Sequence, residues 1–252
     1  MTVDDRGVSG EGIGPPARRT EKISELVARE IVHDMKGLPP ATMLPPEAAM
    51  LGRYRVGRAS LREALRILEV QGLIIIRPGP GGGPMVSAIQ TRDFARMTSL
   101  YLHLSGARYR DVLTARLVME PVMARLAAER QDVADAARLE EFIVSPTAPL
   151  DDAEYKQTSS SFHDVLAGLS GNRVLDFMGR GLKDLYTDRF EQTVFPMEAR
   201  DQIAHDHRAI AKAIVAGNAT RAERLMREHM LDFARFYEER NPGALDEVVD
   251  WR

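Results

Sequence analysis

The sequence contains no cysteine. This absence excludes disulfide bonds, thiolate metal sites and cysteine nucleophiles, and it is consistent with a reducing, cytoplasmic setting. Aromatic residues make up only 6% of the 252 residues and there is a single tryptophan, so the cores must be built mainly from aliphatic side chains and methionine. Such a composition favours helices.

Long apolar runs are also missing. No stretch approaches the roughly 20 residues of a membrane-spanning helix. The N-terminus is acidic and glycine-rich where a signal peptide would need a basic start and an apolar segment. We therefore expect a cytoplasmic protein with no membrane partner, and the length of 252 residues is sufficient for two modest domains.

The charge of the chain is unevenly distributed. Between Ala48 and Arg77 there are six arginines and two glutamates, a net charge of +4, so the remainder carries −7 to give the total of −3. A small basic segment is thus joined to an acidic body. Only the basic segment is expected to be attracted to a polyanion such as DNA.

The N-terminal third shows helical patterning after an unpatterned start. Residues 1–19 are rich in glycine, proline and charge without an apolar period, which predicts a disordered tail. Apolar residues then recur every three or four positions over 21–36 and again over 59–71, which predicts two amphipathic helices. Between them, prolines followed by a glutamate predict the start of a short helix that runs to about Tyr54.

A strand pattern follows these helices. Residues 73–76 are a run of leucine and isoleucine, and a loop rich in glycine and proline separates it from a second short strand at 85–86. Residues 20–88 therefore predict a winged helix-turn-helix with three helices and a β-hairpin wing.

The rest of the chain is patterned as helices. Glycine and proline mark breaks between successive periods, so residues 91–240 predict an all-α bundle of six or seven helices, and residues 241–252 are expected to be a C-terminal tail. The protein is therefore predicted to be mainly α. The expected helices of the bundle cover 91–103, 108–129, 132–143, 152–169, 173–187, 199–216 and 219–240.

A set of residues at fixed spacing runs through the predicted helix-turn-helix: Leu44-Pro45-Pro46-Glu47, then 56–65, then Leu68-Glu69 and Gly72-Leu73-Ile74. This segment resembles the reading head of the GntR family of bacterial transcription regulators over its full length. The resemblance implies a homodimer that binds a pseudo-palindromic operator in double-stranded DNA. It also implies a repressor that is released by a small-molecule effector, expected to be a carboxylate metabolite.

The candidate DNA contacts lie around the second helix of this motif. In helix-turn-helix proteins the N-terminal residues of that helix face base edges, while other elements contact phosphates. Arg58 and Arg62 are four residues apart and hence on one face, where a guanidinium can bind guanine or a phosphate. The predicted DNA-binding residues are Arg53, Arg55, Arg58, Ala59, Ser60, Arg62, Arg77 and Gly79.

Two positions depart from the pattern of the family. Ala48 stands where members similar to the fatty-acid-responsive regulator have an arginine that contacts DNA, and Gly57 stands where threonine or serine is common in the turn. We therefore expect a different operator affinity or preference, with Arg53 and Arg55 as nearby sources of phosphate contacts.

Residues 91–240 resemble the FCD ligand-binding domain of the FadR-type branch of this family. The resemblance implies three histidines, here His163, His207 and His229, around a divalent metal such as zinc or nickel. Family members have an aspartate four residues before the first histidine, but this chain has Ser159. Because a hydroxyl replaces the carboxylate poorly, three alternatives stay open: weak metal binding, a site completed by water or effector, and no metal.

The same resemblance gives the candidate effector-binding residues, which are Arg116, Glu120 and Asn172. Arg116 is placed on the face that lines the pocket, where a guanidinium would match the carboxylate of an effector. The alternative for Arg116 is a salt bridge with Glu120, one helical turn away.

Two other functions fit some of these residues. One is a metal-free regulator of the same family that senses acyl groups. The other is a metal-dependent hydrolase in which three histidines leave a coordination position open for water. The hydrolase has no evident general base, because Asp164 adjoins His163 on a different helical face, and it leaves the winged motif unexplained.

Overall fold

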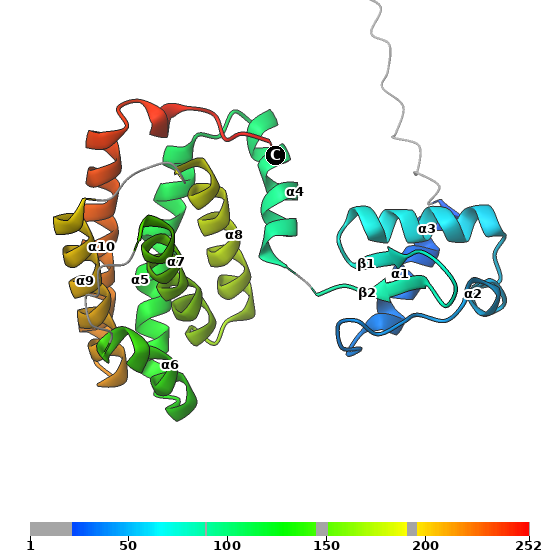
Figure 1. Ribbon diagram of the computed structural model, residues 1–252, viewed down its shortest axis with the longest axis horizontal. Coiled ribbons are helices and arrows are strands. Elements are labelled where there is room, and N and C mark those ends of the chain that lie inside the picture. Colours follow the sequence, from blue (N-terminus) through cyan, green and yellow to red (C-terminus); the bar gives the residue numbers. More distant parts are fainter. Residues whose placement is uncertain (1–21, 89, 145–150, 191–195, 252) are drawn as a thin grey trace, which may run out of the picture. The chain divides into compact units, whose positions relative to one another are not determined.

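The computed structural model describes residues 22–88, 90–144, 151–190 and 196–251. The chain divides into two compact units, with the boundary between Ile89 and Gln90 (Figure 1). The tail predicted over residues 1–19 lies outside the described residues. Within the described ranges, no helix is long and apolar enough to cross a membrane.

The first unit is a winged helix-turn-helix, as the sequence predicts. Its two strands pair in antiparallel register, with Ile74 opposite Val86 and Arg77 opposite Gly83. The second strand begins at Gly83 rather than Met85, because every residue of the first strand has a partner. The elements are α1 (Ile23–Met35), α2 (Glu47–Tyr54), α3 (Arg58–Val70), β1 (Ile74–Arg77) and β2 (Gly83–Val86).

The core of this unit fixes which side of α3 stays accessible. Leu61, Ala64, Leu65 and Leu68 follow the one-face spacing of an amphipathic helix, and all four are buried, chiefly where α3 packs on α1. Burial of this stripe provides most of the packing of α3. The opposite face, which carries the arginines, is left exposed.

The second unit is an all-α bundle of seven helices among the residues described. The long helix α5 contacts α7, α8, α9 and α10, so it forms the centre of the bundle (Figure 1). It is buried on several sides, as its many buried apolar residues indicate. The helices are α4 (Thr91–Leu104), α5 (Tyr109–Arg130), α6 (Val133–Val144), α7 (Asp152–Leu169), α8 (Arg173–Phe190), α9 (Met197–Val215) and α10 (Ala219–Arg240).

The residues after α10, expected to be a tail, pack on the bundle. They form a 3-10 turn over Ala244–Asp246 and then an isolated bridge between Val248 and Arg108. The side chains of Leu245 and Val249 are buried in the core of the bundle. The segment is held because these two apolar side chains leave water, a contact that so short a stretch of sequence does not reveal.

Candidate functional sites: an arginine-bearing helix and a buried histidine cluster

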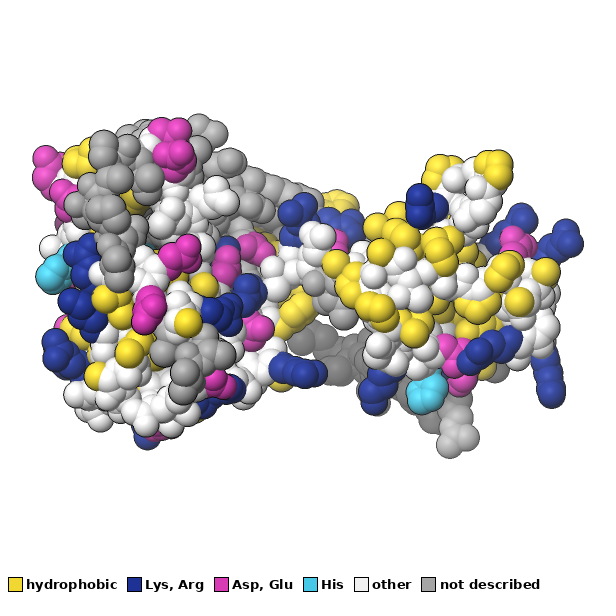
Figure 2. Space-filling view, turned by 60° about the horizontal axis from the view of Figure 1, so that its bottom comes forward, with side chains coloured by type: hydrophobic (Ala, Val, Ile, Leu, Met, Phe, Trp, Pro, Cys, Tyr) yellow, Lys and Arg dark blue, Asp and Glu magenta, His cyan; other side chains and the backbone are white. Residues whose placement is uncertain are grey.

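The predicted DNA-contacting residues gather at the start of α3. Arg58 is the first residue of this helix and Arg62 lies one turn later, and both are exposed. Arg55 ends α2 in the left-handed conformation, with φ 53° and ψ 44°, so the turn between the two helices is short. The described part of the first unit displays few acidic side chains on the face seen in Figure 2, whereas the second unit displays many.

The arginines of this surface differ in their partners. Arg53 pairs with Asp34 of α1 at 2.6 Å, and Arg62 pairs with Glu47 at 3.3 Å. The second pair is exposed on both sides, so it contributes little to stability and can be exchanged for a phosphate. Arg55 and Arg58 have no carboxylate partner among residues 22–88, which leaves both guanidinium groups available to an external anion.

The wing is shaped by close backbone approaches. Arg77 ends β1, and Gly79 lies in the following loop with φ +92°, a conformation that favours glycine. A Cβ atom at Gly82 would lie 2.2 Å from the carbonyl oxygen of Arg77, so only glycine fits at that position. The wing thus presents Arg77 on a tight, glycine-dependent turn.

Three histidines from three helices meet inside the second unit. Ring nitrogens of His163 in α7, His207 in α9 and His229 in α10 all lie within 4.8 Å of one another. The Nε2 atoms of His207 and His229 are 3.3 Å apart, and both residues are buried. The structure therefore brings together the three histidines that the sequence identified as candidate ligands.

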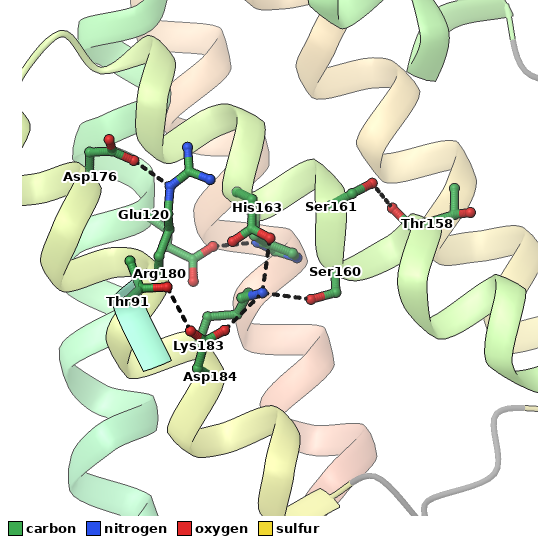
Figure 3. Close-up of polar contacts among 11 residues, drawn as sticks. Thr91, Glu120, Thr158, Ser160, Ser161, His163, Asp176, Arg180, Lys183 and Asp184 are labelled. Atoms are coloured by element: carbon green, nitrogen blue, oxygen red, sulfur yellow. Dashed lines mark hydrogen bonds and ion pairs between the residues drawn. The ribbon is translucent and has the colours of Figure 1, made fainter. Parts of the chain in front are cut away.

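Two carboxylates orient these imidazoles. Glu120 lies 2.5 Å from Nδ1 of His163, and Asp206 lies 3.4 Å from Nδ1 of His229. A carboxylate accepts a hydrogen bond from Nδ1–H, so each ring keeps the Nε2 lone pair for another ligand. The dashed line in Figure 3 marks the contact between Glu120 and His163.

Arg116 is committed to Glu120. Its Nε donates to the carboxylate at 2.7 Å, and its guanidinium lies 5.5 Å from the ring of Tyr186 and 5.9 Å from that of Phe233. Burial alone would raise the pKa of Glu120, but Arg116 and His163 together lower it. The salt-bridge alternative for Arg116 is thus present, and an effector carboxylate would have to compete with Glu120 for the guanidinium.

Burial favours the neutral form of two of these histidines. Burial lowers the pKa of His163, and it lowers the pKa of His207 well below the ordinary value, with the other two histidines adding to the effect at His207. The ring of Phe162 stacks on His207 with centroids 4.0 Å apart. Neutral imidazole is the form that binds a metal ion.

The donor set suits a borderline divalent metal ion. A tetrahedral zinc site with zinc–nitrogen distances of about 2.0 Å has nitrogens roughly 3.3 Å apart, and this is the separation of the Nε2 atoms of His207 and His229. Ser159, one turn before His163, offers a hydroxyl in place of a carboxylate. Its neighbour Tyr155 is buried, which raises the pKa of the tyrosine to about 12. The set is therefore three imidazole nitrogens without an anionic ligand from Ser159.

Asn172 has a capping role. Its side-chain oxygen accepts hydrogen bonds from the backbone N–H groups of Val174 and Leu175, so it caps the N-terminus of α8. The residue is exposed, and among the described residues no contact joins it to the three histidines. Its assignment to the effector site stays a prediction.

Sequence reasoning missed two residues of the histidine cluster, Asp206 and Phe162. Both adjoin a histidine in the sequence, yet each contacts a histidine of another helix, Asp206 reaching His229 and Phe162 stacking on His207. A carboxylate or aromatic residue beside a candidate ligand is the only signal that the sequence offers for them.

A winged helix-turn-helix joined to a helical domain with a buried histidine cluster defines a DNA-binding regulator of transcription. The comparisons with known proteins identify the family. Residues 22–82 match the family described as "Bacterial regulatory proteins, gntR family", and residues 111–232 match the FCD domain. This chain belongs to the GntR family and carries an FCD domain.

Similar proteins are regulators of the same kind. The HTH-type transcriptional regulator LutR of Bacillus subtilis (strain 168) is 26% identical over 199 residues, which cover 77% of this chain and 90% of LutR. The HTH-type transcriptional repressor NanR of Cronobacter sakazakii is 26% identical over 244 residues, 91% of each chain. The hydrolase hypothesis is set aside because these relatives are regulators and not enzymes.

A solved structure has the same fold. The structure of Streptococcus agalactiae GntR matches with a TM-score of 0.64 and 23% identity, covering 84% of this chain and 99% of that one. At this identity the match bears on the fold alone.

Proposed function

We propose that this protein is a repressor whose hold on operator DNA is released by a small carboxylate effector at the histidine cluster. We assign residues 20–88 to the reading head and 91–240 to the effector domain. The observation that carries the proposal is that one chain contains two separate sites. Exposed arginines stand at the start of α3, and three imidazoles, two of them in contact with a carboxylate through Nδ1, converge in the helical domain.

For the reading head, we infer that the start of α3 enters the major groove. Arg58 and Arg62 would contact base edges or phosphates, with Ala59 beside them, while Ser60 and the first amides of the helix would face the backbone. The wing, through Arg77 and the loop at Gly79, would contact adjacent phosphates, as would Arg53 and Arg55.

The DNA-binding proposal is tested by footprinting on the promoter region beside the gene. The double variant Arg58→Ala, Arg62→Ala is expected to lose protection and to bind the protected fragment at least tenfold more weakly. Arg66→Ala is the matched control, because Arg66 lies on the same helix but further from its start, where it pairs with Glu63 at 2.9 Å. Equal binding by the double variant and the parent would contradict the assignment.

For the helical domain, we infer that His163, His207 and His229 would hold one divalent ion, zinc or nickel. The ion would supply a positive charge where the three imidazoles meet, and such a charge attracts an anionic group. Since Ser159 provides no carboxylate, the carboxylate of the effector would complete the ligand set. Arg116 and Glu120 would then act behind the site, with Glu120 orienting His163.

Ser159 favours one alternative, a metal-free sensor of acyl groups in the same family. Elemental analysis of protein purified without added metal distinguishes the two, read beside a Ser159→Asp variant that restores the carboxylate. The metal proposal predicts one ion per chain in the variant and tighter zinc binding than in the parent. Absence of metal from both proteins, with no binding in calorimetric zinc titrations, would leave the metal-free sensor.

We also propose that the protein is a homodimer. Met97, Tyr101 and Leu104 of α4 are 44%, 69% and 76% exposed and are spaced as one helical stripe. They lie away from the buried positions Ala95 and Ser99 of the same helix. A large exposed apolar stripe is typical of a protein interface, and a symmetric dimer would match a pseudo-palindromic operator. Light scattering after gel filtration should give a dimer for the parent and a monomer for Tyr101→Glu.

A further inference from the structure

A buried lysine joins helices α7 and α8 of the second unit. Lys183 of α8 is 9% exposed. Its ammonium donates to Oγ of Ser160 and to Oδ2 of Asp164, both at 3.0 Å and both on α7, and it pairs with Oδ1 of Asp184 at 3.2 Å (Figure 3). An ammonium group has three N–H donors, so these acceptors use all of them.

The connection continues through Asp184 to the start of α4. The second carboxylate oxygen of Asp184 accepts a hydrogen bond from Oγ1 of Thr91 at 2.8 Å (Figure 3). Thr91 is the first residue of α4, immediately after the boundary between the two units. One carboxylate therefore joins Lys183 to the helix that leads into the reading head.

At its other end the connection reaches the histidine cluster. Ser160 and Asp164 are the neighbours of Ser159 and His163 on α7. These four residues lie close together on the continuous helix α7 (Asp152–Leu169), so they are expected to move together. A shift of α7 that follows occupation of the histidine cluster would therefore move both acceptors of Lys183 together.

The helices α4 and α8 are held tightly to each other. Phe94 of α4 lies against Phe177 of α8 with ring centroids 5.0 Å apart. Gly181 makes this contact possible, because a Cβ atom there would lie 2.5 Å from Cδ1 of Phe94. A change at Lys183 is thus passed to α4 through packing as well as through Asp184.

Burial makes the lysine sensitive to its acceptors. Removing an acceptor destabilises a buried charged group much more than an exposed one, because solvent does not replace the lost partner. Lys183 therefore follows the acceptors on α7 or exchanges them for others. Either response changes the field and hydrogen bonding at Asp184.

We propose that Lys183 couples the histidine cluster to the reading head, through α7, Asp184 and Thr91. The inference deepens the proposed function, since it rests on the helical domain being the sensor, and it names the residues that carry the signal out of that domain. It assigns Lys183 a positioning role. The lysine itself would touch neither effector nor DNA.

The test is a double-mutant cycle read by hydrogen–deuterium exchange of the full chain, without metal or DNA. The perturbation is His163→Ala, which removes the contact with Glu120, and the readout is amide exchange over residues 91–95. In the parent background we expect His163→Ala to speed this exchange at least threefold. In the Lys183→Met background the same substitution should leave it within 1.5-fold, because the connection is already broken.

A matched pair of serine variants on α7 provides a milder form of this test. Ser160→Ala removes one acceptor of Lys183, whereas the hydroxyl of Ser161 donates to the backbone oxygen of Thr158 in its own helix (Figure 3). Ser160→Ala should reduce the effect of His163→Ala on residues 91–95, and Ser161→Ala should leave it unchanged. The coupling is overturned if His163→Ala has the same effect with and without Lys183, or none in the parent.

The proposed sensing function is tested in a separate experiment. Zinc and a panel of small carboxylates are added to protein bound to its promoter fragment. If they leave operator affinity unchanged although the exchange cycle shows coupling, the sensing proposal is wrong and the coupling stands. If a ligand weakens operator binding equally in the parent and in Lys183→Met, sensing stands and the coupling is wrong.

Discussion

At the scale of single residues, Glu120 is a buried carboxylate with two close partners. Its side chain is 5% exposed and it faces two partners, Arg116 at 2.7 Å and His163 at 2.5 Å. A carboxylate buried in this way stays ionised because the guanidinium of Arg116 compensates its charge and His163 contributes a hydrogen bond. The residue thus fixes the tautomer of one candidate ligand and neutralises a buried guanidinium at the same time.

The first prediction follows from this double role. Glu120→Gln leaves Arg116 as a buried charge without a counter-ion, so we expect it to lower the free energy of unfolding by about 3 kcal/mol. Glu129→Gln is the matched control, because Glu129 pairs with Arg125 at the same spacing on the same helix but on the exposed side. The control should change stability by less than about 1 kcal/mol. Urea unfolding measures both, and equal effects would show that burial of the Arg116 pair has no energetic consequence.

The second prediction concerns His207 and pH. Its folded-state pKa lies well below the ordinary value because of burial and the two nearby histidines. The folded state therefore binds fewer protons than the unfolded state below about pH 6.5, and stability should fall as the pH falls below that value. One such histidine contributes a slope of up to about 1.4 kcal/mol per pH unit.

The slope is measured by urea unfolding between pH 7 and pH 5 in the presence of a chelator. His207→Asn should flatten it, whereas His205→Asn should not, because His205 is exposed on the same helix two residues earlier. An unchanged slope in His207→Asn would mean that His207 is not held neutral in the folded protein.

Single residues of the histidine cluster could be predicted where a family motif contains them. Contacts that depend on how helices pack could not be predicted. The three histidines could be predicted from their motifs, and the structure brings them within 4.8 Å of one another. The partner of His229 is Asp206, on a neighbouring helix, and no spacing within one helix reveals that contact. Asn172 shows a local contact that the resemblance did not indicate, since its side chain caps α8.

At the scale of elements, the helical periods were the dependable signal. Buried Leu61, Ala64, Leu65 and Leu68 repeat at the spacing of one helical face, and this spacing alone predicts α3 and its exposed side. The segment after α10 shows the limit of the method. Leu245 and Val249 lie in a stretch too short to show a helical or strand period, and their burial depends on contacts with the rest of the bundle.

The third prediction uses the start of α3. Gly57 is the N-cap of this helix, with φ −77° and ψ 162°, and no side chain caps it. A Cβ atom at Gly57 would meet nothing within 4 Å, so a larger residue fits without strain. Gly57→Ser should therefore stabilise the protein by a few tenths of a kcal/mol, and it should be about 1 kcal/mol more stable than Gly57→Ala.

Thermal unfolding of the three proteins measures this difference. Gly57→Ala is the control because it adds the Cβ atom without the capping oxygen. If serine and alanine are equivalent, the hydroxyl does not cap α3. Operator binding by Gly57→Ser then shows whether the serine common in the family at this position improves affinity as well as stability.

At the scale of the whole molecule, charge is separated between the two units. The arginines of the first unit stand on an exposed surface, whereas the chain as a whole carries a net charge of −3. Attraction to DNA is therefore confined to the reading head, and the acidic remainder limits non-specific binding. Binding of this kind should weaken as salt rises, because phosphate contacts release counterions.

The fourth prediction separates two roles among the exposed arginines. Arg77 lies on the wing, where we expect a phosphate contact, so Arg77→Ala should lower the slope of log K against log salt by about 0.9 and weaken all sequences alike. Arg58 begins α3, where we expect a base contact, so Arg58→Ala should cost about 1–3 kcal/mol on the operator and relax its sequence preference. Fluorescence anisotropy at several salt concentrations, on operator and scrambled fragments, measures both. If Arg58→Ala lowered the salt slope and left the preference intact, Arg58 would be a phosphate contact, and the helix would have to read bases through Arg62 instead.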